Sequence, residues 1–226
     1  MRKGFTAALF VLAMVMLVAL PASAEKTVFI KNGTNATAKV YIAFGADSQV
    51  TMKNIGFPCT FFNVEPRGLN CGFDLPAGQQ KQIGQKGQIL GMSVGFNKAP
   101  GCGVTLGEVF ANKTGPGAEA IDISVVDGFN EKIVIEYDNP GNKAASFKIG
   151  PPCGLKDNQK VLGVFPHGCS DCYRMVGVRQ CGPYPTDQCH AAGPNPKCQL
   201  NFGANQKDGT VTLMIVPQNT PCKKQP

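Results

Sequence analysis

Ten cysteines constrain this chain more than any other feature of its sequence. Six of the ten fall between Cys153 and Cys198, in a stretch rich in Gly and Pro that keeps no apolar periodicity. An even number of cysteines in an exported chain indicates a disulfide framework, here of five bridges whose pairing the spacing leaves open. We therefore expect all ten to be bridged: Cys59, Cys71, Cys102, Cys153, Cys169, Cys172, Cys181, Cys189, Cys198 and Cys222.

The first 24 residues indicate export. Arg2 and Lys3 precede a long apolar run that ends in the small-residue sequence Ala-Ser-Ala. A basic start, an apolar middle and such a cleavage pattern are typical of a secretory signal peptide, and a retained N-terminal anchor is the alternative. We expect cleavage before Glu25 and a secreted protein, extracellular or, in a bacterium, periplasmic, with no membrane contact after cleavage.

The charge of the chain argues against nucleic acid as a partner. The formal net charge is +7 at pH 7, from 22 basic and 15 acidic residues. The basic residues are scattered, with no run longer than Lys223–Lys224, and no nucleic-acid-binding motif accompanies them. A solvated basic surface, with affinity for anionic or polysaccharide walls, fits this pattern better.

Upstream of the cysteine-rich stretch the sequence indicates strands. Short β-rich segments such as KTVFIKN, AKVYIAF and EKIVIEYD alternate with Gly, Asn, Asp and Pro, and GTVTLMIVPQ at 209–218 predicts one more strand. Many short strands with Gly-rich turns are typical of an antiparallel sandwich or barrel. We predict a β-sandwich core over 25–150, a Cys/Gly/Pro-rich loop subdomain over 151–200, and a C-terminal strand and tail over 201–226.

The segment IDISVVDGFN, residues 121–130, carries two aspartates in an unusual place. Asp122 alternates with isoleucines in a strand pattern, and Asp127 precedes Gly128 in a pair that favours a tight turn. A half-buried strand with a solvated face and a turn aspartate would explain both residues. A group of carboxylates at the lip of a cleft is the alternative.

The segment VTLGEVF raises a similar question about Glu108. In an unbroken strand Glu108 shares a face with Leu106 and Phe110, which we expect to be the apolar face. Burying a charge there without a partner is costly. Either Gly107 forms a bulge that turns Glu108 outward, or Glu108 meets a hydrogen-bonding partner.

Together these two segments resemble the thaumatin-like proteins. The hallmark of that family is a T-L-A-E-F segment followed, after a short gap, by D-I-S-x-V-D-G-F-N, and its counterparts here are Thr105–Val109 and Asp122–Asn130. TVFIKNGTNATAKVYIAF is similar to the family's first hairpin, and LPAGQQKQI to its L-x-x-G-x-x-x-x-I segment. The resemblance covers residues 26–137 in order and is strongest over 104–130.

The resemblance implies a flattened antiparallel β-sandwich with disulfide-rich loops attached and an acidic cleft between the two. In the family an arginine, a glutamate and aspartates line this cleft, which is associated with β-1,3-glucan binding and, in some members, weak glucanase activity. Carried over, the ligand-binding residues are Glu108, Asp122 and Asp127. The chain has no Trp, so other aromatic side chains would supply a platform: Phe96, Phe110, Phe129 and Tyr137.

The chain departs from the family pattern in the cleft itself. Met92 stands where the family's arginine lies. Arg67, Arg174 or Arg179 could take the place of that arginine only if the fold brings one of them next to the carboxylates. Without it, close carboxylates repel and raise each other's pKa. The family's cysteine after the first strand is also missing. The last cleft aspartate has no clear match among Asp171, Asp187 and Asp208.

A rival site lies in the cysteine-rich stretch. His167, Cys169 and Cys172 are close in sequence, as are Cys189 and His190, and such clusters can bind zinc or exchange disulfides. An exported chain without a βαβ pattern favours structural disulfides instead. We expect no metal and no cofactor.

The sequence thus predicts a secreted monomer that binds cell-wall polysaccharide of the β-1,3-glucan class, as a defence or antifungal protein would. One alternative is an extracellular structural or protein-interaction module that has lost the cleft. Another is a weak endo-β-glucanase with Glu108 as the acid and Asp122 or Asp127 as the base or nucleophile. Because hydrolysis needs one protonated and one ionised carboxyl at a set distance, we expect binding without turnover.

Overall fold

The computed structural model describes residues 25–64, 67–100, 103–113, 119–125, 128–154, 163–165, 200–202 and 206–222. The predicted signal peptide, Asp127, Arg174, Arg179, both histidines and six of the cysteines lie outside these ranges. In the described part of the chain, no helix is long and apolar enough to cross a membrane. The regular elements of that part are strands, apart from one short 3-10 helix, η1 (Lys143–Ala145).

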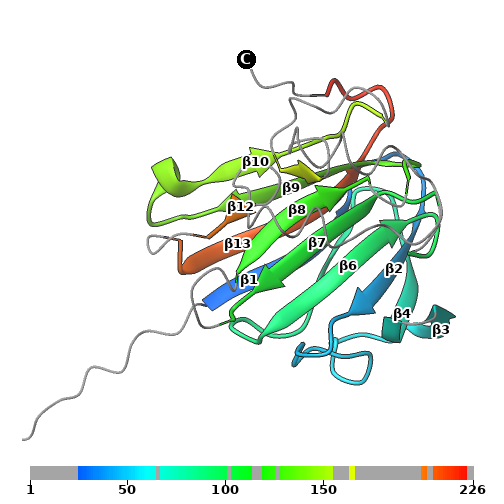
Figure 1. Ribbon diagram of the computed structural model, residues 1–226, viewed down its shortest axis with the longest axis horizontal. Coiled ribbons are helices and arrows are strands. Elements are labelled where there is room, and N and C mark those ends of the chain that lie inside the picture. The colour runs from blue at the N-terminus through cyan, green and yellow to red at the C-terminus, as the bar shows by residue number, and fades with distance from the viewer. Residues whose placement is uncertain are drawn as a thin grey trace, which may run out of the picture.

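The strands form two sheets with a shared core, so the predicted all-β sandwich is confirmed (Figure 1). The smaller sheet has the order β10 (Phe147–Ile149), β9 (Lys132–Asp138), β13 (Asp208–Val216), β1 (Glu25–Asn32) and β5 (Gln80–Gln82). The larger sheet has the order β11 (Val164–Phe165), β8 (Ala120–Ser124), β7 (Leu106–Ala111), β6 (Leu90–Phe96), β2 (Ala38–Phe44), β4 (Arg67–Leu75) and β3 (Thr60–Val64), and β12 (Leu200–Asn201) also pairs with β8.

Alternation of side chains along the strands explains the core. In β1, Val28 and Ile30 point inward, while Leu213 and Ile215 of β13 do the same. The facing sheet contributes apolar side chains from its central strands, among them Val40, Ile42, Met92, Val94, Val109, Ile121 and Ile123. Most ladders are antiparallel, but β1 pairs with β13 in parallel.

The first two strands do not form the hairpin that the sequence suggested. β1 pairs with β13 and β5 in the smaller sheet, whereas β2 pairs with β4 and β6 in the larger one. The connection between them therefore crosses from one sheet to the other. Asn32 holds the start of this crossing, because its side-chain amide donates to the carbonyls of Ala36 and Leu75.

Two disulfides lie within the described residues. Cys59, just before β3, is bonded to Cys71 on β4, and Cys153, after β10, is bonded to Cys222, after β13. The second bond ties the C-terminal segment to the end of the smaller sheet's edge strand. The presence of disulfides is confirmed for these four residues.

A buried charge lies at one end of the smaller sheet. The Lys26 side chain is fully buried, and its ammonium group is 2.8 Å from Glu119 Oε2 and donates to the carbonyl of Lys207. The same ammonium lies 4.5 Å from the centre of the Phe202 ring. Burial lowers the pKa of Lys26, while its hydrogen bond to Glu119 and the charge of Glu119 oppose that shift.

Candidate functional site

Glu108 on β7 and Asp122 on β8 are direct cross-strand partners. On the other side of Glu108, its partner on β6 is Ser93. The Ser93 hydroxyl donates a hydrogen bond of 2.7 Å to Glu108 Oε1. Three polar side chains thus form one row across adjacent strands, on the face of the larger sheet that points away from the core.

Gly107 does not form the predicted bulge. The ladders that join β7 to its two neighbours run without interruption through Glu108. The core face of β7 carries Gly107, Val109 and Ala111, so the face that Glu108 shares with Leu106 is the outer one. The expectation that this was the core face is wrong. The alternative, that Glu108 meets hydrogen-bonding partners, is confirmed.

Asp122 is the more buried of the two acids. Its residue is 8% exposed, whereas Glu108 is half-buried. One carboxyl oxygen of Asp122, Oδ1, is buried and has no hydrogen-bond partner within the described part of the chain. Burial raises the pKa of Asp122 well above its ordinary value, and the charge of Glu108 and a hydrogen bond between the carboxyls raise it further. The predicted repulsion is therefore present at Asp122.

No arginine compensates the pair among the described residues. Met92 is 1% exposed and faces the core between Phe44 and Val109, so this position supplies no cation to the outer face. Arg67 begins β4, which lies three strands from β7 in the sheet. Within the described ranges neither carboxyl forms an ion pair.

The predicted aromatic platform is mostly absent from this face. Phe96 and Tyr137 are buried in the core, and Phe129 is partly buried against it. Phe110, two residues from Glu108 on the same face of β7, is half-buried and remains available. Asp208, a candidate for the last acid of the cleft, lies on β13 in the other sheet.

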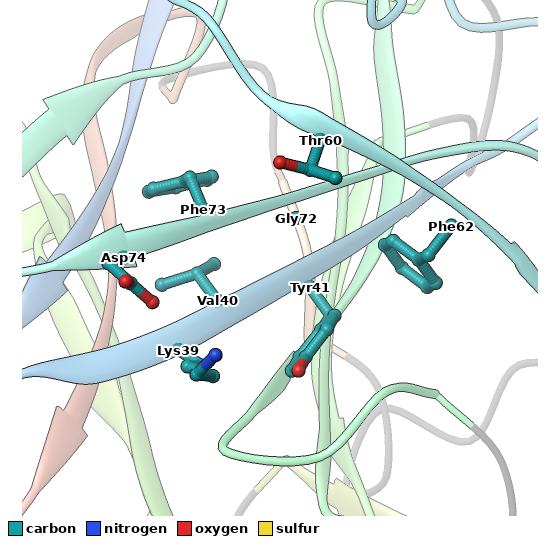
Figure 2. A pocket seen from close by; sticks show the side chains of 8 residues that line it. All are labelled: Lys39, Val40, Tyr41, Thr60, Phe62, Gly72, Phe73 and Asp74. Atoms are coloured by element: carbon teal, nitrogen blue, oxygen red, sulfur yellow. The ribbon is translucent and has the colours of Figure 1, made fainter.

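A pocket that the sequence did not reveal hollows the outer face of β2, β4 and β3 (Figure 2). Its volume is about 260 Å³. The rings of Tyr41 and Phe62 meet edge to face there, with centroids 5.1 Å apart and an interplanar angle of 84°. The lining residues are Lys39, Val40, Tyr41, Thr60, Phe62, Gly72, Phe73 and Asp74.

The described residues define a disulfide-bonded β-sandwich protein with a carboxyl pair on the outer face of its larger sheet. No family model matches the chain, and no curated protein is significantly similar to it. Among solved structures it is similar to the thaumatin-like xylanase inhibitor TLXI, with 12% identity and a TM-score of 0.38, over 84% of this chain and 99% of that one.

A second similar structure is the protein elicitor MoHrip2 from Magnaporthe oryzae, with 10% identity and a TM-score of 0.36, over 85% of this chain and 99% of that one. Both matches are likenesses of low sequence identity and low TM-score. At these values neither bears on what this chain binds.

Proposed function

We propose that this chain is an exported thaumatin-like protein that binds a cell-wall polysaccharide of the β-1,3-glucan class at the Glu108–Asp122 pair. The observation that supports this most directly is that the buried Asp122 Oδ1, beside half-buried Glu108, has no hydrogen-bond partner among the residues that the structure describes. A buried polar atom without a partner is rare in folded proteins and marks a position that a ligand or water can complete.

The chemistry of the row suits a ligand rich in hydroxyl groups. Glu108 accepts hydrogen bonds, the Ser93 hydroxyl both donates and accepts, and Asp122 keeps its proton to a higher pH than an ordinary aspartate. Sugar hydroxyls also donate and accept, so neighbouring hydroxyls on one ring can pair with such a row. Half-buried Phe110 offers an apolar surface beside it.

The geometry favours binding over hydrolysis. In a retaining glycosidase the two carboxyl groups are about 5–5.5 Å apart, with the scissile bond between them. Here Glu108 and Asp122 are direct cross-strand partners, and their carboxyls interact with each other instead of standing on either side of a separate bond. Their roles would also be the reverse of the predicted ones, because Asp122 is the acid whose pKa is raised. We expect no oligosaccharide release from a laminarin-type substrate.

The test is a pull-down of the mature protein on insoluble β-1,3-glucan. We expect Glu108→Gln with Asp122→Asn to reduce the bound fraction strongly, and Asp127→Asn is added as a third substitution. The matched control is Glu136→Gln on β9, a carboxylate of the other sheet that is paired with Lys148. Unchanged binding in the triple variant would contradict the proposal and favour a structural or protein-interaction module.

A further inference from the structure

The Tyr41–Phe62 pocket and the carboxyl pair lie on the same face of the same sheet. Tyr41 on β2 is the cross-strand partner of Gly95 on β6. Ser93, two residues before Gly95 and on the same face of β6, is the cross-strand partner of Glu108 on β7. Adjacent strands are about 4.8 Å apart, so β2 and β7, which are separated only by β6, are about 10 Å apart. The loop after β6 lies over Gly95 on this face, because a Cβ there would be 2.6 Å from the carbonyl oxygen of Lys98, so an extended ligand that contacts both places has to pass beside this loop.

Gly72 creates the floor of the pocket. A Cβ at this position would be 3.5 Å from Tyr41 Cδ1 and 3.5 Å from Phe62 Cδ1, so it would stand between the two rings. The absence of a side chain leaves parts of both ring surfaces uncovered, and both residues are half-buried. The pocket is thus an aromatic recess at the surface, with space for a small ring.

Polar groups surround this aromatic floor. Lys39 and Asp74 are cross-strand partners, both are exposed, and no ion pair joins them in the described part of the chain. Figure 2 shows them at one side of the pocket, with Thr60 and the Phe62 ring at the other. An ammonium group, a carboxylate and hydroxyls around aromatic rings match a sugar ring, which has apolar C–H faces and a rim of hydroxyls.

We propose that this pocket binds one neutral sugar ring of a polysaccharide whose chain continues across β6 to the Glu108–Asp122 pair. This inference rests on the proposed function and adds a second contact to it. The volume of about 260 Å³ is below the roughly 300–1,000 Å³ of sites for drug-sized ligands, which suits a single ring. Binding at two places predicts that affinity rises with oligosaccharide length.

The experiment is calorimetric titration of the mature protein with a β-1,3-linked glucose disaccharide and with a long oligosaccharide of the same linkage. Phe62→Ala removes one ring, and Gly72→Val fills the floor. Phe61→Ala is the matched control, because Phe61 is 52% exposed, is adjacent in sequence and points to the opposite face of β3. Thermal unfolding verifies that each variant is folded.

We expect Phe62→Ala and Gly72→Val each to weaken binding of the long oligosaccharide about tenfold, and Phe61→Ala to leave it unchanged. If Glu108→Gln weakens binding but both pocket variants bind as the wild type does, the pocket inference is wrong and the proposed function stands. If only the pocket variants weaken binding, the pocket is a sugar site and the carboxyl pair is not. An unaltered protein that binds neither sugar overturns both.

Discussion

Gly107 on β7 lies directly against Leu213 on β13, and the leucine side chain fills the space that a Cβ at position 107 would need. That Cβ would be 2.3 Å from Leu213 Cδ1 and 2.9 Å from its Cγ. The two sheets therefore come close together one residue away from Glu108. The glycine that the sequence suggested as a bulge instead permits close packing behind the carboxyl pair.

Gly107→Ala is expected to destabilise the protein. Because the added methyl group overlaps Leu213 in a packed core, the cost is about 1–3 kcal/mol, measured by denaturant unfolding. Gly72→Ala is the control, since it adds a methyl group to a strand glycine with only ordinary contacts. Equal loss of stability in the two variants would show that the Leu213 contact is not the cause.

Asp122→Asn should change how stability depends on pH. The pKa of Asp122 is raised above its ordinary value of 3.8, so the folded state keeps a proton that the unfolded state has lost. The stabilisation from this proton is fully present below the ordinary pKa and is lost as the pH rises through the raised pKa.

Asparagine stays neutral, so the variant avoids that loss. We expect its free energy of unfolding to exceed the wild-type value by about 1–3 kcal/mol near neutral pH, with a difference that shrinks toward about pH 4. Denaturant unfolding over a pH series measures this, and Glu136→Gln on the other sheet provides the comparison. A difference independent of pH would contradict the assignment to Asp122.

For the buried Lys26–Glu119 pair, we expect removal of Glu119 alone to reduce the free energy of unfolding much more than removal of both charges. Glu119→Gln leaves a fully buried ammonium group without its counter-charge and should cost about 3–5 kcal/mol. Adding Lys26→Met removes that charge, so the double variant should recover most of the loss. Lys148→Met, in the exposed Lys148–Glu136 pair, should cost less than about 1 kcal/mol. Additive effects of the two single changes would refute this account.

The two observed disulfides should contribute different amounts to the stability of the protein. Cys153–Cys222 spans a sequence separation of 69 and Cys59–Cys71 one of 12. Chain entropy assigns about 4 kcal/mol to the longer loop and about 3 kcal/mol to the shorter one. Replacing each pair by serines and comparing unfolding midpoints tests this order. If the Cys59–Cys71 variant loses more stability than the other, the length of the closed loop does not determine how much each disulfide stabilises the protein.

The sequence predicted the strands and much of the carboxyl site, because both depend on local patterns. Alternation in residues 121–125 correctly separated Asp122 from the core-facing isoleucines. The same argument failed at Glu108, since Leu106, on its face, is buried although that face is not the core face. A period of two separates the faces of a strand but does not say which one meets the other sheet.

Features that join distant strands could not be predicted. Ser93 reaches Glu108 only through the register of β6 and β7, and no single strand encodes that register. The pocket combines Tyr41 and Phe62 from strands that are separated by β4. The hairpin of β1 and β2, which the resemblance of this segment to the family's first hairpin implied, is wrong because the chain changes sheets between the two strands.

The parallel ladder between β1 and β13 determines when this protein can fold. It joins Glu25 to Asp208, a separation of 183 positions, and β13 separates β1 from β9 in the smaller sheet. That sheet therefore cannot close until β13 has left the ribosome. Such a high contact order slows folding. A chain whose strand β1 must wait for β13 cannot complete this sheet during the early part of its synthesis.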